Sequence, residues 1–488
     1  MVTSGHLPKG LALLRAKVAS SILRVLRIEG SSMIKITKFG GSSVSSAGQF
    51  KKVKAIVQAA PSRRFVVVSA AGKRDKFDSK ITDLLYLVNA HLQYHVTCDD
   101  LLGTIGQRFC EIAKELNLSY PISHEFGIFR ELAKRGEYTP EYIVSRGEYF
   151  TGRMMAEYLG FPFVDAADVI TFRADSSIDM DKTSEKLKAA IGEEKCFVLP
   201  GFYGATEDGK IKLLDRGGGD ITGAIVAQCL GADLYENWTD VSGFLTADPR
   251  IVDNPKSISR ITYAELRELS YMGASVLHEE AIFPVKDAGI PLVIKNTNAP
   301  DDPGTVISEE TEPGVAEPLI TGIAGKKDFV AIHVKTNHMS SKVGYIRKTL
   351  SIFERYRVSI EHIPTGIDSF AVVVQDSDVK DCLYSIVADI KSELEPDEIK
   401  IVDRLALIST VGRNMPSRPG TSGRLFGELG HAGINIRMIA QGSEELDIVV
   451  GVDVDDFERA IRVIYGAFVD SDDNIITVEE AEEEATNE

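Results

Sequence analysis

The sequence lacks the features that mark metal-binding, secreted or membrane-spanning proteins. Its 488 residues contain 5 cysteines, and no two of them form a Cys-x-x-Cys motif. Scattered cysteines without metal-ligand spacing are typical of reduced thiols in a cytoplasmic protein. No apolar run reaches the ~18 to 20 residues that a membrane-spanning helix needs. We therefore expect a cytoplasmic protein without a membrane anchor.

Positive charge is also scarce. The chain has 55 Lys and Arg residues against 72 Asp and Glu residues, which gives a net charge of −17. This balance argues against nucleic acids and anionic membranes as partners. A phosphate-bearing ligand would therefore need a local cluster of backbone donors and cations. The length predicts about three domains.

The chain divides into an alternating first part and a repeated second part. From residue 34 to about 310, short apolar strands alternate with helical stretches, which predicts a three-layer αβα sandwich around a parallel sheet. Residues 300–318 are rich in Asp, Glu, Pro and Gly and predict a linker. A βαββα pattern then occurs twice, which predicts two ferredoxin-like modules with a binding or regulatory role. Strands are expected at residues 34–37, 64–69, 196–200, 232–237 and 291–295 in the first part, and at 329–334, 358–363, 370–375, 406–411, 434–439 and 446–452 in the second.

The two ends of the chain differ from the rest. Residues 1–32 are basic, poor in acidic residues and amphipathic. Such a segment is either a targeting peptide or a surface helix, or else Met33 is the functional start. We favour the last interpretation. Residues 479–488 are acidic, and we expect them to be solvated.

The segment Lys38-Phe39-Gly40-Gly41-Ser42-Ser43 joins a predicted strand to a predicted helix at residues 49–57. A Gly-Gly turn at such a junction leaves backbone N–H groups unpaired, and the helix dipole adds positive potential there. The lysine adds a full positive charge. These features suit a phosphate, although glycines are also used at such turns for steric reasons alone.

Two further polar residues stand where helices are expected to begin. Thr82 opens a helix shortly after the small residues Ser69 to Gly72, and it either caps that helix or contacts a ligand. Glu148 follows a glycine in Ser145-Arg146-Gly147-Glu148. Its carboxylate either interacts favourably with the positive end of the helix dipole or binds an ammonium group of a ligand.

Three consecutive glycines in Arg216-Gly217-Gly218-Gly219-Asp220 precede a helix expected from Ile221. They would destabilise the chain unless a ligand approaches the backbone closely. Arg216 offers bidentate recognition of a carboxylate or phosphate. Asp220 either caps the helix or orients a reacting group or Mg²⁺.

Two more loops, Trp238 to Gly243 and Thr246 to Arg250, follow another expected strand. Each alone is typical of an ordinary turn. Ligands of open α/β sheets bind beyond the carboxyl ends of the strands, however, where such loops converge. Two glycine turns, a lysine, an arginine and several carboxylates together favour nucleotide-dependent phosphoryl transfer.

With these motifs in this order, residues 33–468 resemble the aspartokinase family, whose catalytic domain has the amino-acid kinase fold. The likeness extends to Gly273 to His278 and to Ile294 to Thr297, and the two repeats resemble the paired ACT domains of that family. The resemblance implies ATP-dependent phosphorylation of the side-chain carboxylate of L-aspartate to 4-phospho-L-aspartate, with Mg²⁺. It also implies a place at the start of lysine, threonine and methionine synthesis. The implied domains are an extension (1–32), a catalytic domain (33–312), ACT domains at 319–402 and 403–478, and an acidic tail (479–488).

The resemblance also implies roles for single residues. Lys38 and Asp220 would act at the phosphoryl-transfer centre. Glu148 and Arg216 would hold the amino and carboxylate groups of aspartate, with Thr82 nearby. The residues implied to contact ATP are Lys38, Gly40, Gly41, Ser42, Thr239, Asp240 and Arg250. No residue is assigned as a metal ligand.

The repeats are expected to bind a feedback effector, lysine or threonine. The implied contact residues are Met339, Lys342, Gly344, Tyr345, Ile346 and Glu361. Residues 319–326 are expected to pair with the second repeat, and shared ACT interfaces would give a homodimer or a dimer of dimers.

Three positions depart from the family pattern. Gly219 stands where many members have serine, which argues against a hydroxyl role there, while Ser275 and Glu279 replace a cation and a proline. No dehydrogenase-like domain follows, so we expect a monofunctional enzyme. Two alternatives stay open: a sister kinase acting on glutamate, acetylglutamate or carbamate, and an inactive amino-acid sensor.

Overall fold

The computed structural model describes residues 33–192, 195–215, 217–274, 277, 283–309, 317–416, 418–470 and 475–476. These residues form two compact units, and each is described by itself. The first unit contains the described residues up to 244, together with 259–263, 277 and 283–309. The second contains residues 245–258, 264–274 and the described residues from 317 onward. None of the described helices is both long enough and apolar enough to cross a bilayer.

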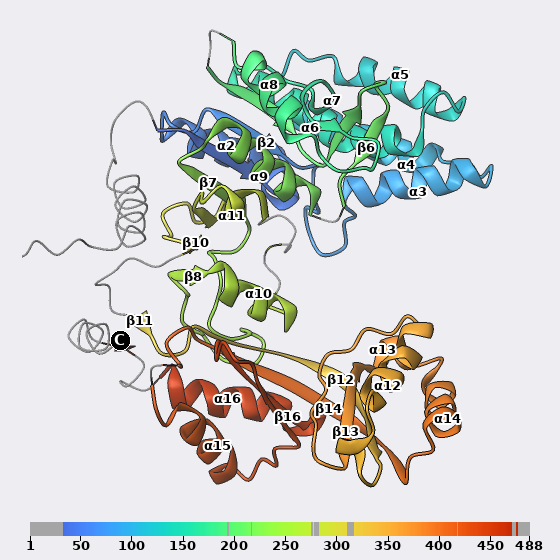
Figure 1. The fold of residues 1–488 in the computed structure, drawn as a ribbon. Coiled ribbons are helices and arrows are strands. Elements are labelled where there is room, and N and C mark those ends of the chain that lie inside the picture. The colour runs from blue at the N-terminus through green and yellow to red at the C-terminus, as the bar shows by residue number, and fades with distance from the viewer. Residues whose placement is uncertain are drawn as a thin grey trace, which may run out of the picture. The chain divides into compact units, whose positions relative to one another are not determined.

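A seven-stranded sheet lies at the centre of the first unit (Figure 1), in the order β4-β2-β1-β7-β9-β10-β8. Its strands pair in parallel except for the antiparallel pair β9–β10. The predicted parallel sheet is therefore confirmed for five of its strands, while β10 and the edge strand β8 run in the opposite direction. The bounds are β1 Lys35–Phe39, β2 Phe65–Val68, β4 Phe197–Pro200, β7 Leu234–Thr239, β8 Arg260–Thr262, β9 Leu292–Asn296 and β10 Thr305–Ser308.

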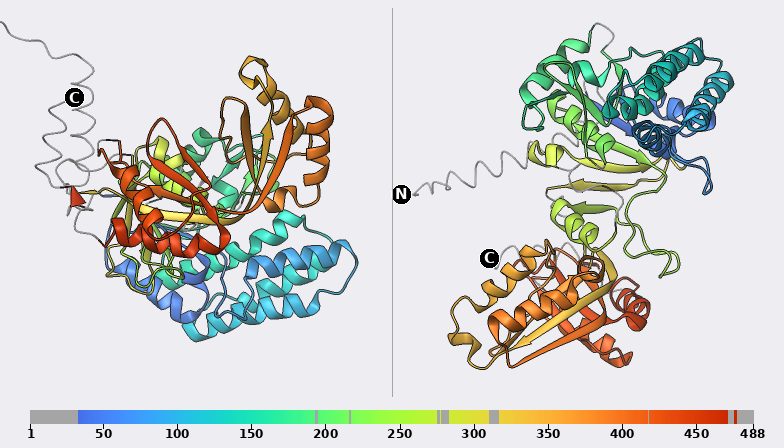
Figure 2. Two further views of the ribbon diagram at one scale, coloured as in Figure 1. Left: turned by 90° about the horizontal axis from the view of Figure 1, so that it is seen from below. Right: turned by 90° about the vertical axis from the view of Figure 1, so that its right-hand side faces the viewer.

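Helices cover both faces of this sheet, as the views in Figure 2 also show. Val66, Val68 and Trp238 point into a core with one group of helices. Tyr235 points to the other face, where its hydroxyl leaves no room for a side chain at Gly223 of α9. The first group is α2 Ala47–Gln58, α3 Ile81–Gln93, α4 Asp99–Leu116, α5 Ile122–Lys134 and α6 Pro140–Leu159; α9 Gly218–Leu230 contacts α8 Met180–Ala190 and α11 Phe283–Asp287. The three-layer αβα sandwich is thus confirmed.

Smaller elements complete the first unit. A three-stranded sheet has the order β3-β5-β6, and a short 3₁₀ helix follows β1. Their bounds are η1 Gly41–Val44, α7 Ala166–Val169, β3 Thr171–Phe172, β5 Tyr203–Thr206 and β6 Ile211–Leu213.

The second unit contains a five-stranded sheet in the order β13-β12-β14-β16-β15. Its two long strands, β12 (Gly322–Lys335) and β14 (Glu398–Val411), pair antiparallel from one end to the other, with a bulge between Lys326 and Phe329. The first part of β12 pairs with the second repeat, as the sequence predicted for residues 319–326, and its later part also pairs with β13. The remaining strands are β13 Ser369–Gln375, β15 Met438–Gln441 and β16 Asp447–Asp453, and a separate small pair joins β11 Glu317–Pro318 to β17 Ile475–Ile476.

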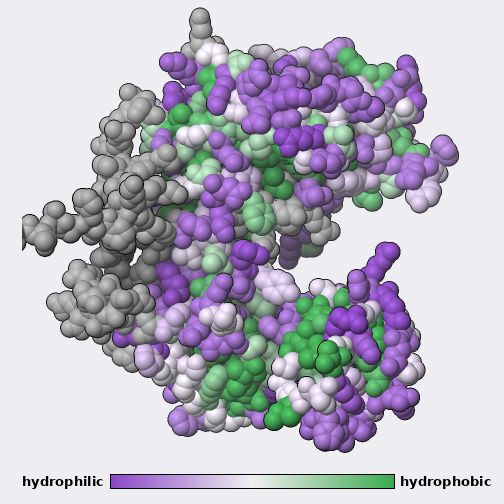
Figure 3. Space-filling view, viewed as in Figure 1, coloured by the Kyte–Doolittle hydropathy of each residue, from purple (hydrophilic) through white to green (hydrophobic). Residues whose placement is uncertain are grey.

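Each repeat has its own hydrophobic core beneath this sheet. The helices are α12 Tyr345–Arg355, α13 Asp376–Val379 and α14 Leu383–Leu394 in the first repeat, and α15 Thr421–His431 and α16 Phe457–Phe468 in the second; 3₁₀ turns lie at η3 Met339–Ser341 and η4 Val454–Asp456. On the face seen in Figure 3, hydrophobic patches alternate with hydrophilic ones over both repeats.

One predicted strand is wrong, because residues 358–363 make only an isolated bridge through His362 to Val373. Arg357 has a left-handed backbone just before this segment, and Pro364 just after it has no N–H to donate.

Two segments that the sequence placed in the catalytic domain pack within the second unit. Ala247 and Val252 belong to the core of the second repeat. Helix α10 (Tyr263–Tyr271) buries Glu265, which accepts hydrogen bonds from Thr321 Oγ1 and pairs with Arg413 at 2.6 Å. Both contacts join residues far apart in the sequence.

Candidate active site

The carboxyl ends of β1, β2 and β7 meet at one edge of the seven-stranded sheet, because these strands are parallel. Backbone hydrogen bonds join the loops that leave them. The N–H of Gly40 donates to the carbonyl of Trp238 at 2.9 Å, and the N–H of Ser69 donates to that of Phe39 at 3.1 Å. The strand-end motifs of the sequence are therefore neighbours in space.

Lys38, near the end of β1, forms an ion pair with Asp220 Oδ1 in the first turn of α9. The side chain of Asn237 on β7 connects the two residues. Its amide nitrogen donates to Asp220 Oδ1 at 2.8 Å, and its oxygen accepts from Lys38 Nζ at 3.4 Å. The side chains of Lys38 and Asp220 are 8% and 17% exposed, so the pair is mostly buried and keeps only a small solvent-exposed surface.

Glycines let the loops of this edge approach one another closely. The N–H of Gly72 donates to the carbonyl of Gly41 at 2.8 Å, and a Cβ on Gly72 would lie 2.6 Å from the carbonyl carbon of Gly41. A Cβ on Gly219 would lie 2.7 Å from Ser69 Oγ and 3.5 Å from Lys38 Cε. The hydroxyl of Ser69 therefore lies next to Gly219. Gly219 is the position at which many members of the family have serine.

Helix α9 begins earlier than predicted, at Gly218, and its N-cap is Gly217 with a φ of 82°. Asp220 therefore does not cap the helix, and the cap interpretation is wrong. Its carboxylate points instead to Lys38 and Asn237. Its place in the first turn also exposes it to the positive end of the helix dipole.

Glu148 lies in the middle of α6, because that helix begins at Pro140 after the N-cap Thr139. The predicted role of Glu148 at a helix start is therefore wrong. The side chain is buried, and its Oε2 has no hydrogen-bond partner. Burial raises the pKa of Glu148 to about 8, against the lowering effect of a backbone hydrogen bond from Ala70. A buried carboxylate with an unused oxygen is suited to bind a cation.

Arg146, two residues before Glu148, is buried among aromatic rings. Its guanidinium lies 4.2 Å from the ring centre of Tyr142 and 4.3 Å from that of Tyr149. It also donates to the hydroxyl of Ser145 at 3.0 and 3.2 Å. These contacts lie within α6, and the ring centre of Tyr203 on β5, 5.5 Å from the guanidinium, connects the helix to a neighbouring strand.

Of the other two predicted substrate residues, the structure describes Thr82 but not Arg216. Thr82 is the second residue of α3 and half-buried, and the N-cap of that helix is Lys80, so Thr82 is not a cap. Ile81, just before it, donates its N–H to the carbonyl of Ala71 at 3.2 Å, which brings the start of α3 close to the end of β2. Arg216, Ser275 and Glu279 lie outside the described residues.

Of the predicted ATP residues, Gly40, Gly41 and Ser42 form the turn after β1. Thr239 ends β7, and its hydroxyl donates to Asp240 Oδ1 at 3.2 Å. Arg250 belongs to a segment of the second unit and pairs with Asp248 at 2.6 Å.

The predicted effector residues all lie in the first repeat of the second unit. Met339 and Tyr345 are buried, and Lys342 Nζ donates to Thr336 Oγ1 at 2.6 Å. Gly344 is the N-cap of α12 with a φ of 76°, and Ile346 follows in that helix. The N–H of Glu361 donates to the carbonyl of Val373 at 2.9 Å.

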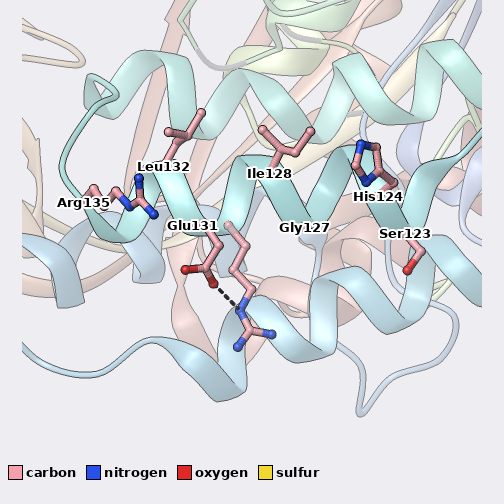
Figure 4. Close-up of a pocket in the computed structure, with 8 residues that line it drawn as sticks. Ser123, His124, Gly127, Ile128, Glu131, Leu132 and Arg135 are labelled. Atoms are coloured by element: carbon pink, nitrogen blue, oxygen red, sulfur yellow. Dashed lines mark ion pairs between the residues drawn. The ribbon is translucent and has the colours of Figure 1, made fainter.

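Two further observations bear on ligands. Among the residues that the structure describes, no group of three or more His, Cys, Asp or Glu side chains is placed to hold a metal ion. A shallow depression of about 610 Å³ lies along α5, lined by Ser123, His124, Gly127, Ile128, Arg130, Glu131, Leu132 and Arg135 (Figure 4). It shares none of these residues with the Lys38 site.

Comparison with known proteins extends these observations. Residues 33–296 match the amino acid kinase family, and residues 408–468 match an ACT domain. Aspartokinase 3 of Bacillus subtilis is 34% identical over 449 residues, which cover 89% of this chain and 98% of that protein.

Solved structures agree with this result. The aspartate kinase of Clostridium acetobutylicum, described as an allosteric enzyme, has a TM-score of 0.84 and 47% identity, covering 90% of this chain and all 100% of that one. Aspartokinase III of Escherichia coli, solved with lysine and aspartate in its T-state, has the same fold with a TM-score of 0.70. Its identity is 24%, over 89% of this chain and 99% of that one.

Proposed function

This chain belongs to the aspartokinase family, and from that premise we propose that it transfers the γ-phosphoryl group of ATP to the side-chain carboxylate of L-aspartate. The products would be 4-phospho-L-aspartate and ADP. The observation that carries the proposal is the cluster of Lys38, Asp220 and Asn237 beside the glycine turn at one sheet edge. A lysine beside a glycine turn suits the charge stabilisation that phosphoryl transfer requires.

The nucleophile needs no general base, because the side-chain carboxylate of aspartate is already ionised at neutral pH. One of its oxygens would attack the γ-phosphorus, and the bond to the β–γ bridging oxygen would break to release ADP. Lys38 would neutralise charge on the transferred group. Asp220 and Asn237 would hold the ammonium group of Lys38 in place. Catalysis would then come from positioning and charge stabilisation.

Glu148 would bind the α-ammonium group of aspartate. Its buried carboxyl has an unpartnered oxygen, and an incoming cation would favour the ionised form. Arg216 would hold the α-carboxylate, and Thr82 would lie nearby at the start of α3.

The nucleotide would lie along the turn of Gly40, Gly41 and Ser42, and Thr239 and Asp240 at the end of β7 would also contact it. We propose that Mg²⁺ enters as its complex with ATP. Mg²⁺ commonly keeps several waters and binds through phosphates and one or two carboxylates. Asp220 is a carboxylate at this edge that is able to face such a complex.

We propose feedback control through the first repeat, with lysine or threonine as effector, and a place at the start of lysine, threonine and methionine synthesis. The E. coli aspartokinase III structure in the T-state contains lysine together with aspartate. Met339, Lys342, Gly344, Tyr345, Ile346 and Glu361 would contact the effector. A cytoplasmic homodimer or dimer of dimers, joined through the ACT repeats, completes the proposal.

The release of ADP from Mg-ATP with aspartate, glutamate, acetylglutamate or carbamate as acceptor tests the substrate. We expect turnover with aspartate alone. Turnover with glutamate but not aspartate would reassign the chain to a sister kinase, and no turnover with any acceptor would favour an amino-acid sensor.

Titration of lysine, threonine and methionine, singly and in pairs, tests the regulation. We expect inhibition by lysine or threonine at constant substrate. A rate that none of the three amino acids changes would contradict feedback control.

A further inference from the structure

The loop between β2 and α3 is closed at its base by one buried guanidinium group, that of Arg108 in α4. Nη2 donates to the carbonyl of Gly72 at 2.5 Å, and Nη1 donates to the carbonyl of Ser79 at 2.6 Å. These two carbonyls lie at the two ends of the loop. Asp78 Oδ2 is 3.4 Å from the same guanidinium.

Arg108 stands on the apolar side of its helix, beside the buried residues Ile105 and Phe109. Its side chain is almost wholly buried, and its Nε has no hydrogen-bond partner. Burying a cation in such surroundings is costly unless its contacts compensate. The two backbone carbonyls are the groups to which its guanidinium donates, so its position is coupled to that of the loop.

The first of these contacts leads directly to the glycine turn. Gly72 donates its N–H to the carbonyl of Gly41 at 2.8 Å, and a Cβ on Gly72 would lie 2.8 Å from the nitrogen of Ser42. No side chain separates the two backbones. A shift of Gly72 by a few tenths of an ångström would therefore move the N–H groups of the turn.

The second contact leads toward α3. Ser79 lies two residues before Ile81, whose N–H donates to the carbonyl of Ala71 at 3.2 Å. This bond already holds the start of α3 independently of Arg108. The turn at Gly41 is joined to Gly72 by one backbone bond and by direct backbone contact, while Gly40 and Ser43 at its two sides also bond the carbonyl of Trp238. A displacement of Gly72 would therefore be felt first at Gly41 and Ser42.

We propose that Arg108 is a positioning residue for nucleotide binding, which holds the backbone donors of Gly41 and Ser42 in place through Gly72. The inference rests on the proposed function, because it takes the glycine turn as the phosphate site. Arg108 itself touches no part of the predicted site. Its planar fork reaches two carbonyls at once, which a lysine ammonium on a flexible stem does not reproduce.

Arg108→Lys is therefore the diagnostic variant, since it keeps the charge and loses one of the two bonds. We expect the dissociation constant of Mg-ADP, measured by calorimetry without aspartate, and the KM for ATP to rise about tenfold. The KM for aspartate should rise less than threefold. Arg74→Lys is the matched control, because Arg74 belongs to the same loop but bonds only the side chains of Asp78 and Glu111; its nucleotide affinity should stay within twofold of wild type.

A second variant covers the case in which Arg108→Lys does not fold. Gly72→Ala leaves Arg108 unchanged but places a Cβ 2.6 Å from the carbonyl carbon of Gly41, so it should displace the turn and weaken Mg-ADP binding in the same way. Unchanged nucleotide affinity in a folded Arg108→Lys or Gly72→Ala variant would overturn the proposal. So would an equal rise in both KM values accompanied by a lower Tm, since that result indicates general loosening. Wild-type protein that binds Mg-ADP but shows no aspartate turnover would contradict the proposed function alone, because the binding test does not depend on turnover.

Discussion

The ammonium group of Lys38 lies against Oδ1 of Asp220, and the amide of Asn237 donates to that same oxygen at 2.8 Å. The three residues come from β1, α9 and β7, so the site is assembled only when the sheet and its covering helix have formed. An ion pair with 8% and 17% side-chain exposure is open enough for an incoming phosphate to compete for the lysine.

Lys38→Ala should lower kcat by about 10³-fold or more, because it removes the cation that faces the transferred group. The Tm should change little, since Asp220 keeps its hydrogen bond from Asn237. Steady-state ADP release measures the rate. Lys51→Ala, at an exposed position of α2, is the control. A Lys38→Ala variant within tenfold of wild type would exclude Lys38 from the chemistry.

Glu148→Gln should raise the KM for aspartate roughly 10- to 100-fold, because a neutral amide replaces the carboxylate that binds the ammonium group. We expect a smaller change in kcat. Glu141→Gln, in the first turn of the same helix, is the matched control. An effect on the KM for ATP but not on that for aspartate would contradict this assignment.

The same residue predicts a pH dependence of stability. Burial raises the pKa of Glu148 from 4.5 to about 8 in the folded protein. Between these values the folded state holds a proton that the unfolded chain has released, so the free energy of unfolding falls as pH rises through this range. Glu148→Gln has no carboxyl group to titrate, so its free energy of unfolding should not fall for this reason.

Without aspartate, the Tm of Glu148→Gln should therefore match wild type near pH 5 and exceed it above pH 8, by about 5 °C. Thermal melts at both pH values measure the difference. A constant offset between the two proteins at every pH would show that the carboxyl of Glu148 does not titrate in this range.

Gly219→Ser should reduce activity about tenfold, because its Cβ would lie 2.7 Å from Ser69 Oγ. Ser69→Ala in the same chain removes that oxygen and should restore part of the loss. A double-mutant cycle in kcat/KM measures the coupling. Additive effects of the two substitutions would show that these residues do not share the space.

The sequence predicted the convergence of Lys38 and Asp220 because the carboxyl ends of parallel strands share an edge. It missed Asn237, since a polar residue near a strand end has no distinguishing mark in a single sequence. The start of α6 was predictable, because Thr139-Pro140 is a typical N-cap and first-turn pair. Arg108 also left a trace, as a cation on the apolar side of an amphipathic helix.

The division into units was beyond the reach of local patterns. The contact of Glu265 with Arg413 joins residues 148 positions apart. Nothing in the sequence around either residue indicates that the two side chains meet. The alternation of strands and helices predicts that residues 245–258 and 264–274 belong to the α/β domain, whereas they pack in the second unit. Only the packed structure assigns them to the second unit.

The shared strands β12 and β14 mean that the two repeats are not separable modules. The boundary that the repeat pattern places between residues 402 and 403 falls inside β14. Scission there would leave both halves with unpaired strand edges, which promote aggregation. Amide hydrogens along both strands should therefore exchange with solvent as one cooperative block. We therefore expect the two repeats to unfold in one transition rather than one after the other.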